Sequence, residues 1–308
     1  MPPAHADRSP AARLLAVGGA AAGAMAAAGL ATTAYAIWEA RQYTLRQVQV
    51  PVLPAGAEPV ALLHISDLHL AARDTDRAAW VAGLADLSPD VVVATGDFLS
   101  APEGLSLLRT GLGPLLSTPG AFVFGSNDYF SGKPINPAKY LRGPSRRPRR
   151  QPDLPTAELR DWLLAAGWLD LNNAGGTITV GGDLLSFLGS ADPHIKLDDY
   201  ASIAGGWAVG AAVRIGVVHA PYRRVLDAMA ADGAQLILAG HTHGGQVCLP
   251  GYGTLVTNCD LDRARARGLS HYDDSWLHVS AGLGTNPNAP IRVACRPEAT
   301  LLELVAAA

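Results

Sequence analysis

Six short apolar runs restrict most strongly what this chain can fold into. Each run is five or six residues long, is dominated by aliphatic side chains, and ends in or is followed by Gly or a polar residue. Apolar runs of this length predict strands that are buried on both faces of a sheet. The runs lie at residues 60–65, 91–95, 121–125, 184–189, 214–219 and 235–239.

Helical patterns lie between several of these runs, at residues 77–87, 156–166 and 223–231. Alternation of strands and helices predicts an α/β fold in which neighbouring strands pair in parallel. The stretch 276–305 is richer in short strands, so we expect mixed sheets rather than purely parallel ones. Hydrophobic residues make up 49% of the 308 residues, which supplies a core for one large domain and excludes wholesale disorder.

Charge argues against a general nucleic-acid-binding protein, and cysteine content excludes two kinds of cysteine-based framework. The net charge is −3, whereas a general nucleic-acid-binding protein is normally basic. The 3 Cys residues include no closely spaced pair, which excludes a disulfide framework and a zinc site of the CxxC type. We expect them to be small buried hydrophobic residues.

A Pro-rich segment at 132–155 carries most of the local positive charge. We interpret it as a solvated surface loop or as a basic flap over a phosphate-bearing substrate or an anionic lipid surface. Its cations are Lys133, Lys139, Arg142, Arg146, Arg147, Arg149 and Arg150.

Residues 14–38 contain no charged side chain, and a helix of this length measures about 37 Å, against about 30 Å for a bilayer core. We predict a transmembrane signal-anchor helix that holds the protein at the cell membrane, with the large domain outside the cytoplasm. Two alternatives stay open: a signal peptide cleaved after Ala34-Tyr35-Ala36, and a buried or loosely attached helix. The predicted organisation is a tail at 1–13, the anchor at 14–38, a Pro-marked linker at 39–59 and one domain at 60–308.

Side chains that bind metals follow several of the predicted strands. Asp67 and His69 come directly after the first run, Asp97 follows the second, and His219 ends the fifth. In open α/β sheets ligands bind at the carboxyl ends of the strands, so we expect these side chains to lie close together. Mixed carboxylate and imidazole donors suit a divalent ion such as Mn, Fe, Zn or Co.

The segment Gly240-His241-Thr242-His243-Gly244-Gly245-Gln246 is the strongest single signal for such a site. Its two His residues are spaced i, i+2, and the flanking Gly residues let the backbone approach a ligand closely. Each strand end by itself has an ordinary reading as a turn, a cap or a structural His. With Gly125-Ser126-Asn127-Asp128 after the third run, five such strand ends lie in one chain, and together they favour a metal site. His64, inside the first run, we interpret as a supporting or structural residue.

The ordered set of motifs resembles the calcineurin-like metallophosphoesterase superfamily. The motifs are Asp67-x-His69, Gly96-Asp97, Gly125-Ser-Asn-Asp128, Gly216-x-x-His219 and Gly240-His-Thr-His243. The GHTHGGQ form, with Gly284-Thr285 and Cys295-Arg-Pro, is similar to the superfamily's membrane-associated bacterial branch. The resemblance covers about residues 60–305. It implies a four-layer α/β/β/α sandwich with two mixed sheets and a binuclear metal centre.

The resemblance also implies a role for each matching residue. Asp67, His69 and His243 hold the first metal ion, and Asp97 bridges both ions. His219 and His241 hold the second. The family completes this second site with the Asn of a Gly-Asn-His-Asp motif, and the following His takes part in catalysis.

This sequence departs from that motif. Without a gap, Ser126 takes the position of the family's Asn and Asn127 takes that of its His. A one-residue bulge at the strand end would bring Asn127 to the metal instead, and we favour this alignment because an amide oxygen is the better ligand. In both alignments no His occupies the acid position, so Asp128, Tyr129 or a metal-bound water would replace it.

The function that the resemblance implies is hydrolysis of a phosphoester, with a phosphodiester or pyrophosphate favoured. The attacking hydroxide is activated at the binuclear centre. The expected substrate is a phosphate-ester small molecule or a lipid-linked phosphate. The alternatives are a non-catalytic module of the same fold that binds metal or phosphate, and a nuclease, against which the low basicity argues.

Overall fold

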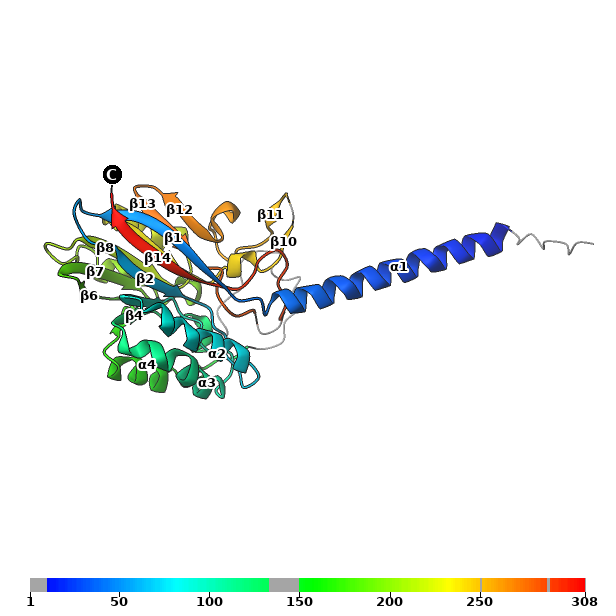
Figure 1. Cartoon of the computed structure of the whole chain (residues 1–308), viewed down its shortest axis with the longest axis horizontal. Coiled ribbons are helices and arrows are strands. Elements are labelled where there is room, and N and C mark those ends of the chain that lie inside the picture. Colours follow the sequence, from blue (N-terminus) through cyan, green and yellow to red (C-terminus); the bar gives the residue numbers. More distant parts are fainter. Residues whose placement is uncertain (1–9, 133–149, 250, 287–288, 308) are drawn as a thin grey trace, which may run out of the picture.

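The computed structural model describes residues 10–132, 150–249, 251–286 and 289–307, and in the N-terminal helix it describes side chains from Gly23 onward. One six-stranded sheet has the order β1-β14-β2-β3-β4-β5 (Figure 1). Its strands pair in parallel except where β14 meets β2. They are β1 Thr44–Leu53, β2 Val60–Ile65, β3 Val91–Ala94, β4 Gly120–Phe122, β5 Leu169–Asp170 and β14 Glu298–Ala306.

A second six-stranded sheet has the order β12-β13-β9-β8-β7-β6 and is also mixed. Its three central pairs are parallel, and the pairs at its two edges are antiparallel. Its strands are β6 Ala174–Val180, β7 Asp183–Ser190, β8 Val213–Val218, β9 Leu236–Ala239, β12 Gly268–Tyr272 and β13 Ser275–Val279. A small hairpin pairs β10 Cys248–Leu249 with β11 Gly253–Thr254.

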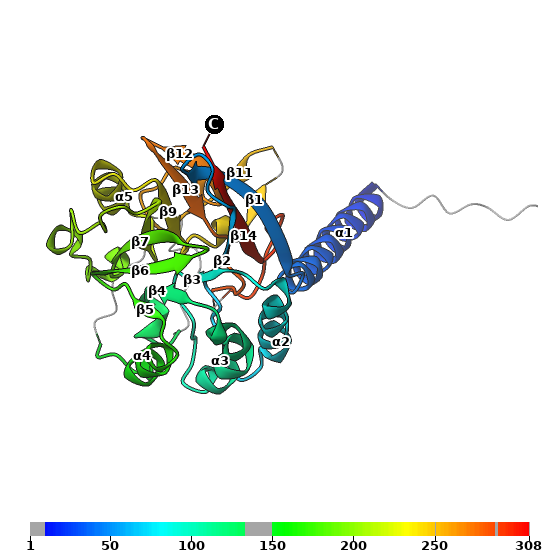
Figure 2. The ribbon, with the colours of Figure 1, turned by 60° about the vertical axis from the view of Figure 1, so that its left-hand side comes forward.

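Three buried clusters divide the domain into four layers. Side chains from the facing sides of the two sheets, such as Val93 and Phe187, form the central cluster. Helices α2 Thr75–Gly83, α3 Gly104–Leu112 and α4 Thr156–Ala165 cover the outer face of the first sheet (Figure 2). Helix α5 Arg223–Ala231 covers the outer face of the second. The predicted sandwich with two mixed sheets is therefore found.

The prediction of a linker at residues 39–59 is wrong, because this segment contains β1. The strand pairs with β14 from Thr44, opposite Glu298, through Val50, opposite Leu304. It lies at the edge of the sheet, and Pro51 is tolerated there because an edge strand has one side without ladder hydrogen bonds. The domain therefore begins before residue 60.

Helix α1 Pro10–Glu39 extends away from the domain in both views (Figures 1 and 2). Among the described residues, no helix has both the length and the hydrophobicity that a membrane crossing requires. The predicted span at 14–38 is therefore not found. Its sequence is mostly Ala and Gly, which gain little free energy from leaving water.

The C-terminal end of α1 is fixed to the domain by buried contacts. The carboxylate of Glu39 accepts the backbone N–H groups of Ala294 and Cys295, each at 3.0 Å. The carbonyl oxygen of Ala36 accepts the Arg292 N–H at 3.0 Å. The predicted basic loop at 132–155 lies mostly outside the described residues, which include only its two ends.

Candidate metal centre

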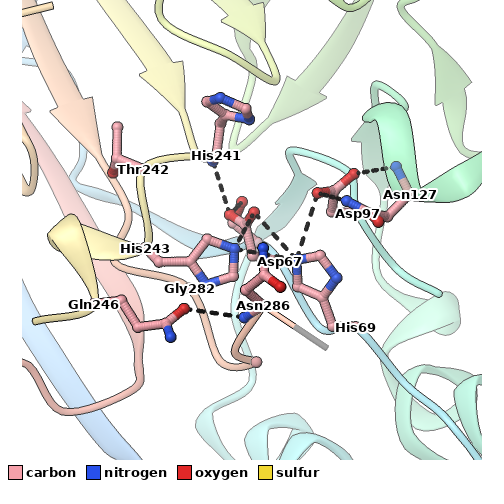
Figure 3. Close-up of polar contacts among 12 residues, drawn as sticks. Asp67, His69, Asp97, Asn127, His241, Thr242, His243, Gln246, Gly282 and Asn286 are labelled. Atoms are coloured by element: carbon pink, nitrogen blue, oxygen red, sulfur yellow. Dashed lines mark hydrogen bonds and ion pairs between the residues drawn. The ribbon is translucent and has the colours of Figure 1, made fainter. Parts of the chain in front are cut away.

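The predicted ligands come together where four central strands end. Asp67 and His69 follow β2, Asp97 follows β3, His219 follows β8, and His241 and His243 follow β9. Figure 3 shows Asp67, His69 and His243 pointing toward one another, with Asp97 beside them. Strands from both sheets therefore contribute to one site.

Five of these six residues have left-handed backbone conformations, which non-Gly residues rarely adopt. Each such residue costs about 1–3 kcal/mol, and this cost is typical of functional sites that the surrounding structure holds in place. Here the Asp67 N–H donates to the Gly96 carbonyl and the His69 N–H to the Asp97 carbonyl, both at 2.9 Å. The φ values are 52° at Asp67, 45° at His69, 54° at Asp97, 68° at His241 and 51° at His243.

The first half-site consists of Asp67, His69 and His243, whose donor atoms all lie within 4.8 Å of one another. The Nε2 atoms of His69 and His243 are 3.1 Å apart. The Nε2 atom of His243 is also 3.4 Å from Asp67 Oδ1. This grouping matches the predicted ligands of the first metal ion.

The second half-site shares Asp67 and adds Asp97 and His219, again within 4.8 Å. The Oδ2 atom of Asp97 lies 3.4 Å from His69 Nε2 and 3.4 Å from His219 Nε2. A single carboxylate oxygen thus faces an imidazole nitrogen of each half-site. This is the position that a bridging ligand requires.

The donor atoms of the site fit divalent cations. Asp67 Oδ1 and His219 Nε2 are fully buried and have no hydrogen-bond partner among the described residues. Buried polar atoms are normally satisfied, so open atoms that face one point indicate a ligand. The Nδ1–H of His219 donates to the Thr95 carbonyl at 2.6 Å, which leaves Nε2 as the nitrogen that faces the site.

The environment shifts the pKa of several ligands. Burial lowers the pKa of His69 to about 4 and holds those of His241 and His243 well below the usual value, so these rings are neutral and able to bind metal. Burial raises the pKa of Asp67 to about 6, against the opposing effect of the His219 charge. Burial also disfavours the charged form of His219, but the Asp97 carboxylate outweighs it and raises the pKa well above its usual value.

Asn127 lies directly beside the predicted bridging carboxylate. Its backbone N–H donates to Asp97 Oδ1 at 2.7 Å, and its Nδ2 donates to Asp97 Oδ2 at 2.8 Å. The predicted bulge is not found, since β4 pairs with β3 in regular register and a short 3₁₀ helix, Ser126–Asp128, follows. The turn of this helix, rather than an inserted residue, brings the amide to the site.

Asp128 is placed differently from the prediction that it replaces the missing acid. Its carboxylate accepts the backbone N–H groups of Asp97 at 2.8 Å, Phe98 at 2.7 Å and Gly125 at 2.9 Å. Burial and the Asp97 charge raise its pKa to about 8. Both oxygens are nevertheless occupied by the backbone and the side chain is fully buried, so Asp128 supports Asp97 and does not face a leaving group.

His241 lies next to the second half-site but outside the two compact donor groups of the described residues. Its backbone N–H donates to Asp67 Oδ2 at 2.9 Å, and its ring meets that of His219 edge to face, with centroids 5.2 Å apart. The ring centroid of His194 lies 4.6 Å from that of His241. None of the motifs that resemble the family includes His194, so its place beside His241 was not predicted.

Arg292 also shapes the site, and none of the predicted motifs includes it. The fully buried Arg292 guanidinium donates to the carbonyls of Ala281 at 2.7 Å, Gly282 at 3.0 Å and Gly284 at 2.6 Å. The Gly284 N–H in turn donates to the Asp67 carbonyl at 2.6 Å. At Gly125, an added Cβ would lie 2.3 Å from Asp97 Oδ1, so only Gly fits this close approach.

Comparison with known proteins decides the family. Residues 60–245 match the family described as calcineurin-like phosphoesterase, which is more than half of the chain. The chain belongs to this family of phosphoesterases. The expected superfamily and the expected class of hydrolase are thus confirmed.

This phosphoesterase is 27% identical to the uncharacterized metallophosphoesterase YkoQ of Bacillus subtilis over 261 residues, covering 82% of this chain and 86% of that one. It is 33% identical to the phosphodiesterase YaeI of Escherichia coli over 92 residues, or 30% of this chain and 32% of that one. A transmembrane protein with a metallophosphoesterase domain from Bos taurus is 28% identical over 275 residues, covering 84% and 56%.

Among solved structures, this phosphoesterase is similar to the phosphopantetheinyl hydrolase PptH of Mycobacterium tuberculosis. The TM-score is 0.42 at 13% identity, over 79% of this chain and 96% of that one. A dimetal phosphatase from Danio rerio gives a TM-score of 0.39 at 11% identity, over 73% and 88%.

Proposed function

We propose that this phosphoesterase hydrolyses a phosphodiester or a pyrophosphate at a centre of two divalent ions. The observation that carries the proposal is the position of Asp97, whose Oδ2 lies 3.4 Å from an imidazole nitrogen of each half-site. Two divalent ions held at these half-sites would supply Lewis acidity to the phosphoryl oxygens and would activate the attacking water. The phosphodiesterase name of the Escherichia coli relative supports a diester substrate.

Seven residues of the chain would hold the two ions in this proposal. Asp67, His69 and His243 would hold the first ion, and His219 and His241 would hold the second. Asp97 would contribute to both, since its Oδ2 faces a nitrogen of each half-site. Asn127 completes the second site after its amide rotates, because a rotation of 180° replaces the nitrogen that faces Asp97 by Oδ1. The buried Asp128 keeps the Asp97 backbone in its left-handed conformation by accepting its N–H.

In neither alignment of Gly125-Ser126-Asn127-Asp128 with the family motif does a His occupy the position of the family's catalytic one. Protonation of a leaving group by a general acid contributes about 10²–10⁴-fold to a rate. We therefore infer that the preferred substrates have leaving groups that depart without a proton. Aryl diesters and pyrophosphates meet this condition, whereas simple alkyl diesters do not.

The test is turnover of a panel of phosphodiesters by the purified full chain with added Mn²⁺. We expect the rate to rise steeply as the pKa of the leaving group falls, and Asp97→Ala to abolish turnover. A pyrophosphate, a monoester and a single-stranded nucleic acid complete the panel. Because no His occupies the acid position, a non-catalytic module of the same fold is the second candidate. That candidate is the correct one if Mn²⁺ binds and every substrate stays intact.

We further propose that α1 holds the domain at the cell membrane, on its extracytoplasmic side. Support comes from large apolar side chains that are exposed along this helix, namely Met25, Leu30, Ile37 and Trp38. The name of the bovine relative also describes a transmembrane protein. Fractionation of cells tests the proposal: we expect the full chain with the membranes, and recovery of the intact chain in the soluble fraction would contradict it.

A further inference from the structure

A continuous chain of five buried side chains leads from the second sheet into the metal centre. His278 on β13 contacts His64 on β2, with 2.8 Å between their Nδ1 atoms. His64 Nε2 is 2.9 Å from Thr95 Oγ1, which donates to Ser66 Oγ at 2.7 Å. Ser66 donates to Asp67 Oδ2 at 2.5 Å. All five residues are at most 2% exposed, so water does not compete for these contacts.

The chemistry of the groups fixes the direction of every hydrogen bond in this chain. An ionised carboxylate accepts only, so Ser66 donates its single proton to Asp67 and accepts from Thr95. Thr95 has then used its own proton and accepts from His64, whose Nε2 must carry hydrogen. Burial keeps the pKa of His64 well below its usual value and lowers that of His278 to about 3, so both rings are neutral.

The same reasoning fixes the tautomers of the two rings. A neutral His64 with hydrogen on Nε2 has a bare Nδ1, which accepts from the Nδ1–H of His278. His278 then has a bare Nε2, and this atom has no partner in the described part of the chain. Every donor therefore points toward Asp67. Hydrogen bonds aligned in one direction polarise and strengthen one another.

The last hydrogen bond of this series determines which oxygen of Asp67 is left to bind an ion. Oδ2 accepts the Ser66 hydroxyl and the His241 N–H, the latter at 2.9 Å. Oδ1 stays open and faces His243 Nε2 at 3.4 Å. Asp67 is thus presented to the half-sites through one oxygen.

Thr95 acts on the other side of the centre as well. Its carbonyl accepts the Nδ1–H of His219 at 2.6 Å and so presents the His219 Nε2 to the second half-site. The Thr95 backbone therefore contacts His219 directly, and the Thr95 side chain is linked to Asp67 through the Ser66 hydroxyl. None of the family motifs in the sequence includes Thr95, His64 or His278.

We propose that Thr95 is the positioning residue of this metal centre, and that the His278–His64 pair orients its hydroxyl so that Asp67 offers only Oδ1 to the ions. The inference rests on the proposed function in so far as ions bind here. Groups that orient metal ligands change metal affinity by about 10–100-fold when they are removed.

The chain offers a matched control for removal of the Thr95 hydroxyl. Thr300 on β14 is fully buried, pairs with His64 across the strands, and has a hydroxyl without a partner among the described residues. Thr→Val keeps the shape of the side chain at both positions. Only Thr95→Val interrupts the series of hydrogen bonds that reaches Asp67.

The first experiment measures Mn²⁺ affinity of the full chain by titration calorimetry. We expect Thr95→Val to weaken binding about 10–100-fold, Thr300→Val to leave it at the wild-type value, and Thr95→Ser to restore it. Equal affinities for Thr95→Val and Thr300→Val would overturn the inference while the proposed function stands. A wild type that binds no Mn²⁺ would instead overturn the proposed function.

The second experiment needs no variant that must fold. Nitrogen NMR of the full chain labelled at His distinguishes the two neutral tautomers of each ring. We expect hydrogen on Nε2 of His64 and on Nδ1 of His278 between pH 7 and 8, where Asp67 is ionised. The opposite tautomer at His64 would mean that Thr95 donates to the ring and no longer to Ser66, which contradicts the inference whatever the metal content.

Discussion

The carboxylate of Asp128 supports the backbone of Asp97, accepting its N–H at 2.8 Å from a fully buried position. The same carboxylate accepts two further backbone N–H groups, so its removal leaves three buried donors unpaired. Each unpaired buried donor costs about 1–3 kcal/mol. We expect Asp128→Ala to lower the free energy of unfolding by more than about 2 kcal/mol and to reduce Mn²⁺ binding through Asp97.

Chemical denaturation measures this effect, with Asp90→Ala as control. The Asp90 carboxylate accepts a single backbone N–H, from Ala61 at 2.8 Å in an exposed setting. Asp128→Ala with unchanged stability and metal content but lost turnover would contradict a supporting role and restore the predicted role as acid.

We expect Asp97 to be required for binding of both ions and His69 for binding of one. Asp97→Ala removes an oxygen that faces both half-sites, whereas His69→Ala removes a nitrogen of the first half-site only. We expect elemental analysis at saturating Mn²⁺ to give two ions per chain for the wild type, about one for His69→Ala and fewer than one for Asp97→Ala. One ion or none in the wild type would exclude a binuclear centre.

Metal binding is expected to release a proton from His219. The pKa of this ring is raised well above its ordinary value of 6.5, mainly by Asp97 against the effect of burial, so the metal-free ring is charged at neutral pH. The ion pair of His219 with Asp97 contributes fully to the stability of the metal-free fold below pH 6.5. This contribution is lost as the pH rises through the raised pKa of His219. A divalent ion needs the neutral ring, so affinity should rise with pH.

Calorimetry of Mn²⁺ binding in buffers of different ionisation enthalpy counts the released protons. We expect about one proton per chain near pH 7 from His219, and a smaller number in His219→Ala. A binding enthalpy that is the same in every buffer would show that His219 is already neutral in the metal-free protein.

Replacement of Asn127 separates its two possible positions. If its amide binds the second ion, Asn127→Ala should lower the metal content toward one ion per chain and remove most activity. If it only occupies the family's acid position, Asn127→His should keep both ions and raise turnover of alkyl diesters by about 10²-fold or more. Ser126→Ala separates the same alternatives, because Ser126 takes the metal position only when Asn127 takes the acid position. We expect this variant to keep both ions if the Asn127 amide is the ligand.

The sequence by itself determined the central strands and the candidate metal ligands at their ends. Residues 91–94 are apolar throughout, so they are expected to be buried, and Asp97 follows at the end where parallel strands present ligands. The apolar run and the position of Asp97 after it are both visible in a short stretch of sequence. Helix α5 was predicted at its observed bounds, Arg223–Ala231, for the same reason.

Only the tertiary structure decided the contacts between residues that are far apart in the chain. The edge strand β1 forms because β14 lies beside it. Thr44 and Glu298 are paired in these strands, although they lie near opposite ends of the domain's sequence. His64 and His278 are 214 positions apart, and each alone reads as a structural His. Their shared role depends on which strands face each other across the two sheets. That arrangement is set by packing of the whole core, and no local pattern records it.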